Sequence, residues 1–248
     1  MKRITKYFLL LTLLTPFIVD SFAYKAVIFD CDGVLVDTEG LKFQAWKESL
    51  ARYNISFTLE EYIGLVGYSS EHIIKEIQKM KNVSLDESEV INYKNTRYRE
   101  LQKQGVPSLM AAVNFLQQVI ELRNKGAIKL GLASSDGRRE ILHNLASIGV
   151  DSNNFDAILS GQDDLKDISD PEGTNKPKPY IYQRTAKKLN IDPSECIVFE
   201  DSSAGVYAAS SAGMTVVAIP NSYTNNQDFS RAVNITTFRD MDINTLTQ

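Results

Sequence analysis

The chain has little cysteine, only 2 residues in 248, so no disulfide framework can hold its fold together. It also has no excess of basic residues, because 27 lysines and arginines stand against 31 aspartates and glutamates. A mildly acidic chain lacks the positive surface that nucleic acids bind, so we expect no nucleic-acid partner. Apolar residues at 43% and charged residues at 23% are ordinary for a folded soluble protein and exclude disordered, collagen-like and polytopic membrane proteins.

Residues 1–23 differ in composition from the rest of the chain. Three basic residues precede an apolar run over residues 7–19, and Ser21-Phe22-Ala23 has the small residues that signal peptidases require. The run is short for a membrane span, which needs about 20 residues. We therefore expect a cleaved signal peptide, export to the periplasm or the exterior, and no stable membrane association afterwards. A buried N-terminal helix and an uncleaved anchor are the alternatives.

The rest of the chain alternates between apolar strand patterns and helix patterns. Continuously apolar runs bounded by turn residues predict strands that are covered on both faces. Five such runs occur: Lys25–Asp30, Ile128–Ser134, Ala157–Gly161, Cys196–Asp201 and Met214–Pro220. Helix patterns lie between the later runs: Ser108–Lys125, Arg138–Ile148, Pro179–Leu189 and Ala204–Ala212. This alternation predicts an α/β fold with a doubly wound, Rossmann-like parallel sheet, which binds ligands at the carboxyl ends of its strands.

Residues 39–105 interrupt this alternation and contain only helix patterns. The segment is far too long for one crossover between strands. One helix has an apolar stripe formed by Phe43, Trp46, Leu50 and Tyr53. Capping boxes are predicted at Thr58–Glu61 and Ser84–Glu87. We expect a helical cap over residues 39–105 and a core formed by residues 24–38 and 106–248.

Two aspartates follow the first predicted strand. Asp30 and Asp32 are two residues apart at its carboxyl end, so both side chains lean to the same side. Carboxylates this close repel each other unless a cation or a shared proton intervenes. Oxygen-rich clusters of this kind suit Mg²⁺. The alternative is a polar strand end that leads into an ordinary turn at Gly33.

Polar side chains also stand at the ends of the later strands. Ser134 and Ser135 end the second run, where hydroxyl groups and helix-start amides form a phosphate site. Glu200 and Asp201 end the fourth run, and Lys176 lies where a helix opens among prolines. Each feature has an ordinary explanation, as a helix cap or a surface charge. Their coincidence at four strand ends favours a catalytic site.

The sequence resembles the haloacid dehalogenase-like hydrolases. Four motifs carry the resemblance: Asp30-Cys-Asp-Gly-Val-Leu-Val-Asp-Thr38, Ser134, Lys176-Pro-Lys-Pro179 and Glu200-Asp201. A cap inserted after the first motif is similar to the subgroup with β-phosphoglucomutase, phosphoglycolate phosphatase and sugar-phosphate phosphatases. The resemblance implies a Mg²⁺-dependent phosphatase of small phosphorylated metabolites. We further expect the protein to be a monomer.

The resemblance also implies a role for each matching residue. Asp30 would be the nucleophile that forms an aspartyl phosphate, and Asp32 the general acid and then the general base. Ser134, Ser135 and Lys176 would hold the phosphoryl oxygens. The Mg²⁺ ligands would be Asp30, the backbone carbonyl of Asp32, and Asp201. Glu200 would either bind the ion directly or contact one of its ligands.

Other activities remain open within and outside this family. Dehalogenases lack the second aspartate, which is present here. Phosphonatases use a cap lysine, and Lys42 lies in that region, but on a cap helix it is expected to be a solvated charge. Mutases clamp a second phosphate with cap cations, whereas Val66 and Ser70 occupy two of those positions here. A β-phosphoglucomutase-like mutase is therefore the alternative, and a phospho-accepting receiver or a silent binding module is more remote.

Two features lie outside the motifs. Residues 162–175 form an unusually long, acidic loop. It either shapes access to the site, discourages very anionic substrates or is simply solvated, and we favour the last of these. Cys31 would end the first strand and Cys196 begin the fourth. A rise of about 3.3 Å per residue would then keep the two sulfurs too far apart to bond, so both cysteines are expected to be free.

Overall fold

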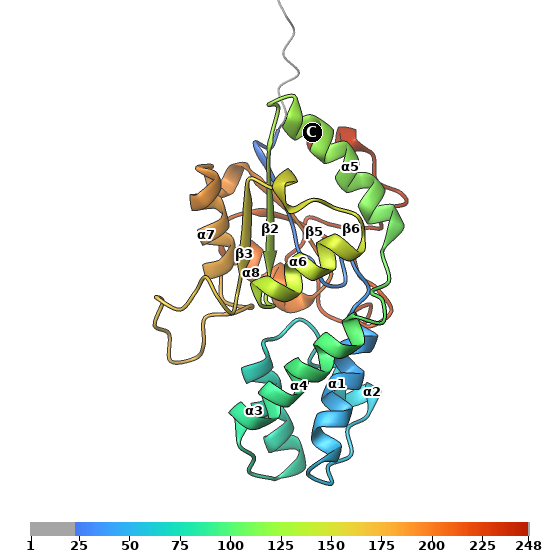
Figure 1. The fold of residues 1–248 in the computed structure, drawn as a ribbon. Coiled ribbons are helices and arrows are strands. Elements are labelled where there is room, and N and C mark those ends of the chain that lie inside the picture. Colours follow the sequence, from blue (N-terminus) through green and yellow to red (C-terminus); the bar gives the residue numbers. More distant parts are fainter. Residues whose placement is uncertain (1–22, 248) are drawn as a thin grey trace, which may run out of the picture.

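The computed structural model describes residues 23–247. Its centre is one sheet of six strands in the order β3-β2-β1-β4-β5-β6, with every neighbouring pair parallel (Figure 1). The strands are β1 (Ala26–Phe29), β2 (Lys129–Ser134), β3 (Ala157–Ser160), β4 (Cys196–Glu200), β5 (Thr215–Ala218) and β6 (Asn234–Ile235). The predicted α/β fold with a doubly wound parallel sheet is confirmed.

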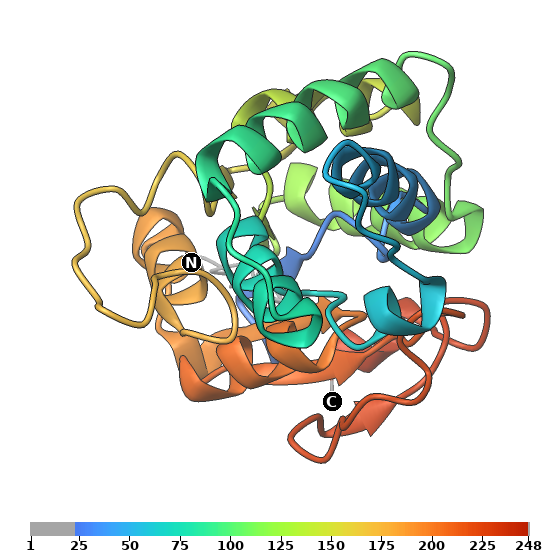
Figure 2. The ribbon, with the colours of Figure 1, turned by 90° about the horizontal axis from the view of Figure 1, so that it is seen from below.

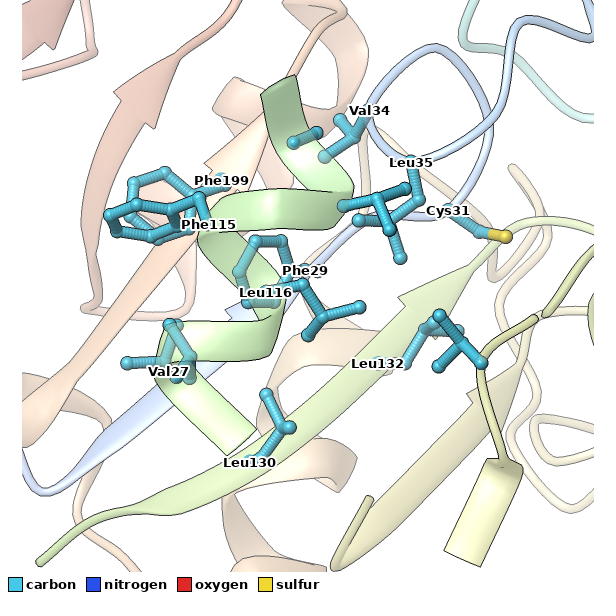
Figure 3. Packing of buried hydrophobic residues seen from close by; sticks show 14 of the residues in the cluster. Val27, Phe29, Cys31, Val34, Leu35, Phe115, Leu116, Leu130, Leu132 and Phe199 are labelled. Carbon is cyan, nitrogen blue, oxygen red and sulfur yellow. The ribbon is translucent and has the colours of Figure 1, made fainter. Parts of the chain in front are cut away.

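Helices cover both faces of the sheet. They are α5 (Met110–Asn124), α6 (Arg138–Ser147), α7 (Tyr180–Leu189) and α8 (Ser203–Ser211), with short 3-10 turns η1 (Ser152–Asn154), η2 (Pro193–Glu195) and η3 (Ile243–Thr247). Alternate residues of β1 enter opposite layers: Val27 and Phe29 pack with α5 and α6, whereas Ala26 and Ile28 pack with α7 and α8. Figure 3 shows Phe29 among Phe115 and Phe199, whose ring centroids lie 5.4 Å apart. This two-sided burial explains the unbroken apolar runs of the strands.

The five predicted strands and four predicted core helices are all present, with ends that differ by at most two residues. The sixth strand, β6, was missed. It has only two residues, both exposed, and pairs with β5 alone at the edge of the sheet. Such a strand has no apolar run from which it could be predicted.

Four further helices lie at the carboxyl end of the sheet: α1 (Glu39–Ala51), α2 (Leu59–Ile63), α3 (Ser70–Lys81) and α4 (Glu87–Gln102). Figure 2 shows the molecule from this end, with these four helices in front of the sheet. They bury an apolar cluster of their own, in which Trp46, Leu50 and Ile74 are almost fully inaccessible. We call residues 39–105 the cap and the rest of the described chain the core. That these are two domains stays a prediction.

One of the two predicted capping boxes is correct. Thr58 and Glu61 exchange the expected hydrogen bonds at the start of α2. The box at Ser84–Glu87 is wrong, because α4 is capped by Asp86, whose carboxylate accepts a hydrogen bond from the amide of Glu89. Leu85 and Val90 pack in the same cluster and form a hydrophobic staple that favours this later start.

Several predictions concern the chain outside the core motifs. The predicted signal peptide lies outside the described residues, except for Ala23, whose amide donates a hydrogen bond to the carbonyl of Leu246. Residues 23–247 contain no helix with the length and apolarity that a membrane span requires. Cys31 and Cys196 are both buried and free, as predicted.

Candidate active site

A cavity lies between the cap and the carboxyl end of the sheet. The core lines it with residues that follow β1, β2 and β4, together with Lys176 from the loop before α7. The cap lines it with α1, the loop between α2 and α3, and α4. Because parallel strands end at the same edge of a sheet, side chains far apart in the sequence meet here.

Lys176 joins two acidic residues that end different strands. Its Nζ donates hydrogen bonds to Asp30 Oδ1 and Glu200 Oε1, each at 2.6 Å, and to the carbonyl of Ala133 at 3.1 Å. All three charged side chains are buried. Burial raises the pKa of Asp30 to about 8; the positive charge of Lys176 opposes the rise, and the negative charge of Glu200 adds to it. Asp30 and Lys176 are thus brought together as predicted.

Glu200 is held entirely by the protein. Besides Lys176, its carboxylate accepts hydrogen bonds from the Tyr182 hydroxyl, the amides of Asp201 and Ser202, and the Ser202 hydroxyl, five in all. A carboxylate has about four lone-pair sites, so little capacity is left for a further ligand. This arrangement favours Glu200 as the residue that positions Lys176 rather than as a direct metal ligand.

Three buried carboxylates lie close enough together to hold a metal ion, those of Asp30, Glu200 and Asp201. One carboxylate oxygen from each lies within 4.8 Å of the others. Three buried carboxylates and one ammonium leave an excess of negative charge, and burial together with the neighbouring carboxylates raises the pKa of Asp201 well above its usual range. The oxygens of Asp30 and Asp201, with the negative charge of Glu200 beside them, fit a hard divalent cation. The Asp32 carboxylate is not part of the cluster, and its backbone carbonyl stays a predicted ligand.

The position of Asp201 depends on a glycine and an asparagine. Asn221 Nδ2 donates a 2.7 Å hydrogen bond to Asp201 Oδ2. Gly33 has φ +80°, and a Cβ there would lie 2.0 Å from the same oxygen, so only glycine fits. Asn221 was not predicted, because it follows β5 and belongs to none of the four motifs.

Asp32 belongs to a separate network. Its Oδ1 accepts hydrogen bonds from Thr38 Oγ1 at 2.6 Å and Asn144 Nδ2 at 3.2 Å, and Lys42 Nζ lies 3.2 Å away. Ser134 Oγ donates to Asp32 Oδ2 at 3.2 Å. Although burial opposes ionisation, the charge of Lys42 and the Thr38 hydrogen bond hold the pKa of Asp32 below its usual range. Thr38 and Asn144 were not predicted as partners.

The two serines at the carboxyl end of β2 differ in their hydrogen bonds. Ser134 donates to Asp32 and accepts a hydrogen bond from the amide of Asp136 at 3.1 Å. Ser135 lines the cavity, and its Oγ is buried without a hydrogen-bond partner among the described residues. A buried hydroxyl without a partner costs free energy, so Ser135 is the more available donor for a phosphoryl oxygen.

Lys42 is not the solvated cap charge that we expected. Its side chain is only 14% exposed and stands among three carboxylates, those of Asp32 at 3.2 Å and of Glu39 and Asp136 at 3.4 Å. The expectation was wrong because α1 points this face at the core rather than at water. Lys42 therefore joins the cap to the core directly beside Asp32.

Lys94 is a cavity-lining cation that the sequence analysis missed. It is 4% exposed and donates 3.3 Å hydrogen bonds to Ser70 Oγ and Asn95 Oδ1, but no carboxylate of residues 23–247 pairs with it. Its ammonium also lies 5.5 Å from the ring centroids of Trp46 and Tyr98. Burial lowers its pKa. A signal was available, because Lys94 is spaced four residues from both Val90 and Tyr98, on the buried stripe of α4.

The cap is closed onto the core. Gly67 has φ +96°, and a Cβ there would lie 2.5 Å from Ser202 of the core. Gln227 Nε2 donates to the carbonyl of Val66 at 3.2 Å. The cavity measures about 50 Å³, whereas ligand pockets usually exceed about 300 Å³. We therefore expect the cap to move when a substrate enters.

The acidic loop 162–175 is tied to its own surroundings. Asp164 pairs with Arg138, Asp167 with Arg184, and Asp170 with Lys178. Of this loop, only Gln162 lines the cavity among the described residues. Its acids therefore stabilise the loop against α6 and α7 and do not point at a substrate.

Residues 27–219 match the model of the haloacid dehalogenase-like hydrolase family. The chain belongs to this family. It is 34% identical over 193 residues to a phosphorylated carbohydrates phosphatase of Thermotoga maritima, covering 77% of this chain and 82% of that protein. It is 33% identical over 204 residues to the β-phosphoglucomutase of Bacillus subtilis, covering 79% and 83%. The structure resembles a β-phosphoglucomutase of Clostridium difficile, with a TM-score of 0.74, 26% identity and coverage of 90% and 95%.

Proposed function

We propose that this protein is a phosphatase of small phosphorylated metabolites that forms an aspartyl phosphate on Asp30. The observation that carries the proposal is the separation of two buried aspartates into two networks. Asp30 is hydrogen-bonded to Lys176 beside an acidic cluster, whereas Asp32 is held by Thr38, Ser134 and Asn144. Two carboxylates in different environments can take different roles in one reaction. The similarity to the phosphorylated carbohydrates phosphatase of Thermotoga maritima supports this reaction class.

In the proposed first step, a carboxylate oxygen of Asp30 attacks the phosphorus atom while the bond to the leaving oxygen breaks. Lys176 neutralises charge on Asp30, and the Ser135 hydroxyl donates to a phosphoryl oxygen. A Mg²⁺ ion bound by Asp30 and Asp201 would screen the phosphate dianion and favour the ionised form of Asp30.

Asp32 would serve both halves of the reaction. It gives a proton to the leaving oxygen in the first step and takes one from the water that attacks phosphorus in the second, which releases inorganic phosphate and restores Asp30. The low pKa of Asp32 keeps this carboxyl ionised, as the attack by water requires. The first task requires a protonated Asp32, which the ammonium of Lys42 disfavours, so we propose that substrate binding displaces Lys42 from this carboxylate.

The experiment that tests this proposal is hydrolysis of p-nitrophenyl phosphate and of a panel of phosphorylated metabolites, with and without Mg²⁺. We expect Mg²⁺-dependent release of inorganic phosphate. A well-folded protein that turns over none of these compounds would contradict the proposal.

A hexose-phosphate mutase is the second candidate, favoured by the relative from Bacillus subtilis and by Lys94, a cavity cation without a carboxylate partner among residues 23–247. We prefer hydrolysis because Val66 and Ser70 offer no charge with which to clamp a second phosphate, and because Asp136 adds a carboxylate to the cavity. With glucose-1-phosphate as substrate, free phosphate and glucose-6-phosphate can be followed in parallel. We expect free phosphate to dominate and glucose-1,6-bisphosphate not to accelerate the reaction. Stoichiometric isomerisation would establish the mutase instead.

We also propose that the protein is exported after cleavage behind Ala23. Cleavage there would remove the backbone hydrogen bond between Ala23 and Leu246 but keep Tyr24, which packs against the core. The fold therefore tolerates the new N-terminus. N-terminal sequencing of the protein from its native cells is expected to begin at Tyr24, and a soluble cytosolic form that begins at Met1 would contradict export.

A further inference from the structure

Asp136 places a carboxylate in the cavity that none of the proposed steps uses. It lies between β2 and α6, and both sides of its backbone are held: its amide donates to Ser134 Oγ, and its carbonyl accepts a 2.7 Å hydrogen bond from Ser160 Oγ. The side chain is 13% exposed and lines the cavity. Its Oδ2 is buried and accepts no hydrogen bond from residues 23–247.

This carboxylate lies beside the proposed general acid. Lys42 Nζ is 3.2 Å from Asp32 Oδ1 and 3.4 Å from Asp136 Oδ2, so the two carboxylates flank one ammonium. Asp32 is proposed to give a proton to the leaving oxygen. In that position of the substrate, Asp136 Oδ2 can reach a group on the carbon next to the one that bears the leaving oxygen.

The charge at this place is negative. Lys42 stands among three carboxylates, because Glu39 is also 3.4 Å from it, and the charge of Lys94 acts on Asp136 as well, which leaves more carboxylates than ammonium groups among these described residues. A carboxylate oxygen only accepts hydrogen bonds. Asp136 can therefore accept a hydrogen bond from a hydroxyl group, whereas an anionic group would meet a like-charged oxygen in a largely buried site.

We propose that Asp136 determines substrate class by accepting a hydrogen bond from a hydroxyl on the carbon next to the phosphorylated one. The preferred substrates are then monophosphates of polyols and sugars, and compounds with a carboxylate or a second phosphate at that carbon are rejected. Lys94, which donates a hydrogen bond to Ser70 of the cap, offsets part of the negative charge of Asp136 but does not remove the excess of carboxylates. The inference rests on the proposed phosphatase activity and on Asp32 facing the leaving oxygen.

Two probes with two carbons each isolate this contact. In 2-hydroxyethyl phosphate the carbon next to the phosphorylated one carries a hydroxyl, and in phosphoglycolate that carbon forms a carboxylate. We expect the Mg²⁺-loaded enzyme to prefer 2-hydroxyethyl phosphate by about tenfold or more in kcat/KM, the discrimination that one buried polar contact commonly supplies. Asp136→Asn keeps an acceptor for the hydroxyl but removes the charge. It should shift the ratio towards phosphoglycolate by about tenfold, mainly through a lower KM for the acid.

Glu172→Gln is the matched control, because it removes one negative charge from the loop outside the cavity and should leave the ratio unchanged. Equal rates of the wild-type enzyme on the two probes would overturn the inference, even if Asp136→Asn failed to fold. An unchanged ratio in folded Asp136→Asn would overturn it as well. If p-nitrophenyl phosphate were hydrolysed in either of these cases, the proposed function would stand. If the wild-type protein hydrolysed none of these compounds, both the inference about Asp136 and the proposed phosphatase function would be overturned.

Discussion

The Asp30 cluster of the core and Lys94 of the cap bury charge in opposite ways. In the core, Asp30, Glu200 and Asp201 crowd around one ammonium, so the cluster has an excess of negative charge. In the cap, Lys94 is buried with hydroxyl, amide and aromatic neighbours and with no carboxylate partner among the described residues. This difference supports the proposal that the core binds a cation and a phosphoryl group. It likewise supports the proposal that the cap and the loop that faces it select the substrate.

The largest expected effect comes from the core nucleophile. Asp30→Asn should lower kcat by about 10⁴-fold or more, since an amide of nearly the same shape cannot attack phosphorus. Because burial already disfavours the ionised form of Asp30, the melting temperature should stay the same or rise. Asp37→Asn, which changes an exposed aspartate of the same segment, is the control. Substantial turnover by Asp30→Asn would move the chemistry away from this residue.

Removal of the divalent cation should have the next largest effect. Treatment with EDTA is expected to lower the rate by about 100-fold or more, because the acidic cluster then repels a phosphate dianion. Mg²⁺ added in excess should restore the rate. Asp201→Asn should raise the Mg²⁺ concentration required for half-maximal activity. Full activity of the dialysed, EDTA-treated enzyme would show that Lys176 alone supplies the screening.

A smaller effect should follow from disturbing the contact between cap and core. Gly67→Ala places a methyl group against Ser202 and should lower kcat/KM for sugar phosphates about tenfold by holding the cap open. Gly105→Ala is a close control, because this cap glycine also has positive φ but its Cβ would meet no atom within 4 Å. Equal losses in both variants would indicate backbone strain rather than impaired closure.

The smallest effect should be the most informative about the cap. Lys94→Met removes a buried ammonium that lacks a carboxylate partner, so the free energy of unfolding should rise by about 1 kcal/mol. The KM for sugar phosphates should rise about fivefold, since a substrate contact is lost. Lys75→Met, on the exposed face of α3, should change neither value. Reduced stability of Lys94→Met would mean that the cap needs this charge for folding, which would weaken the contrast with the core.

The sequence indicated which side chains of the core lie together but not which side chains of the cap join them, for a structural reason. Residues at the ends of parallel strands converge whatever the details of packing, so Asp30, Lys176 and Asp201 could be grouped from their positions alone. Lys42 and Lys94 depend on how each cap helix is rotated against the core. Asn144 and Asn221 act through single hydrogen bonds from elements without a motif, and such contacts leave no pattern in the chain.

The central claim is that the core transfers a phosphoryl group to Asp30. It can be tested directly in Asp32→Asn with labelled p-nitrophenyl phosphate, whose leaving group needs no proton: the variant should accept the phosphoryl group but lack the base that activates water for its release. After brief incubation with labelled substrate and acid quenching, peptide mass spectrometry should find the phosphoryl group on Asp30, and hydroxylamine should remove it. A folded Asp32→Asn protein that carries no phosphoryl group, or carries it on another residue, would contradict the account.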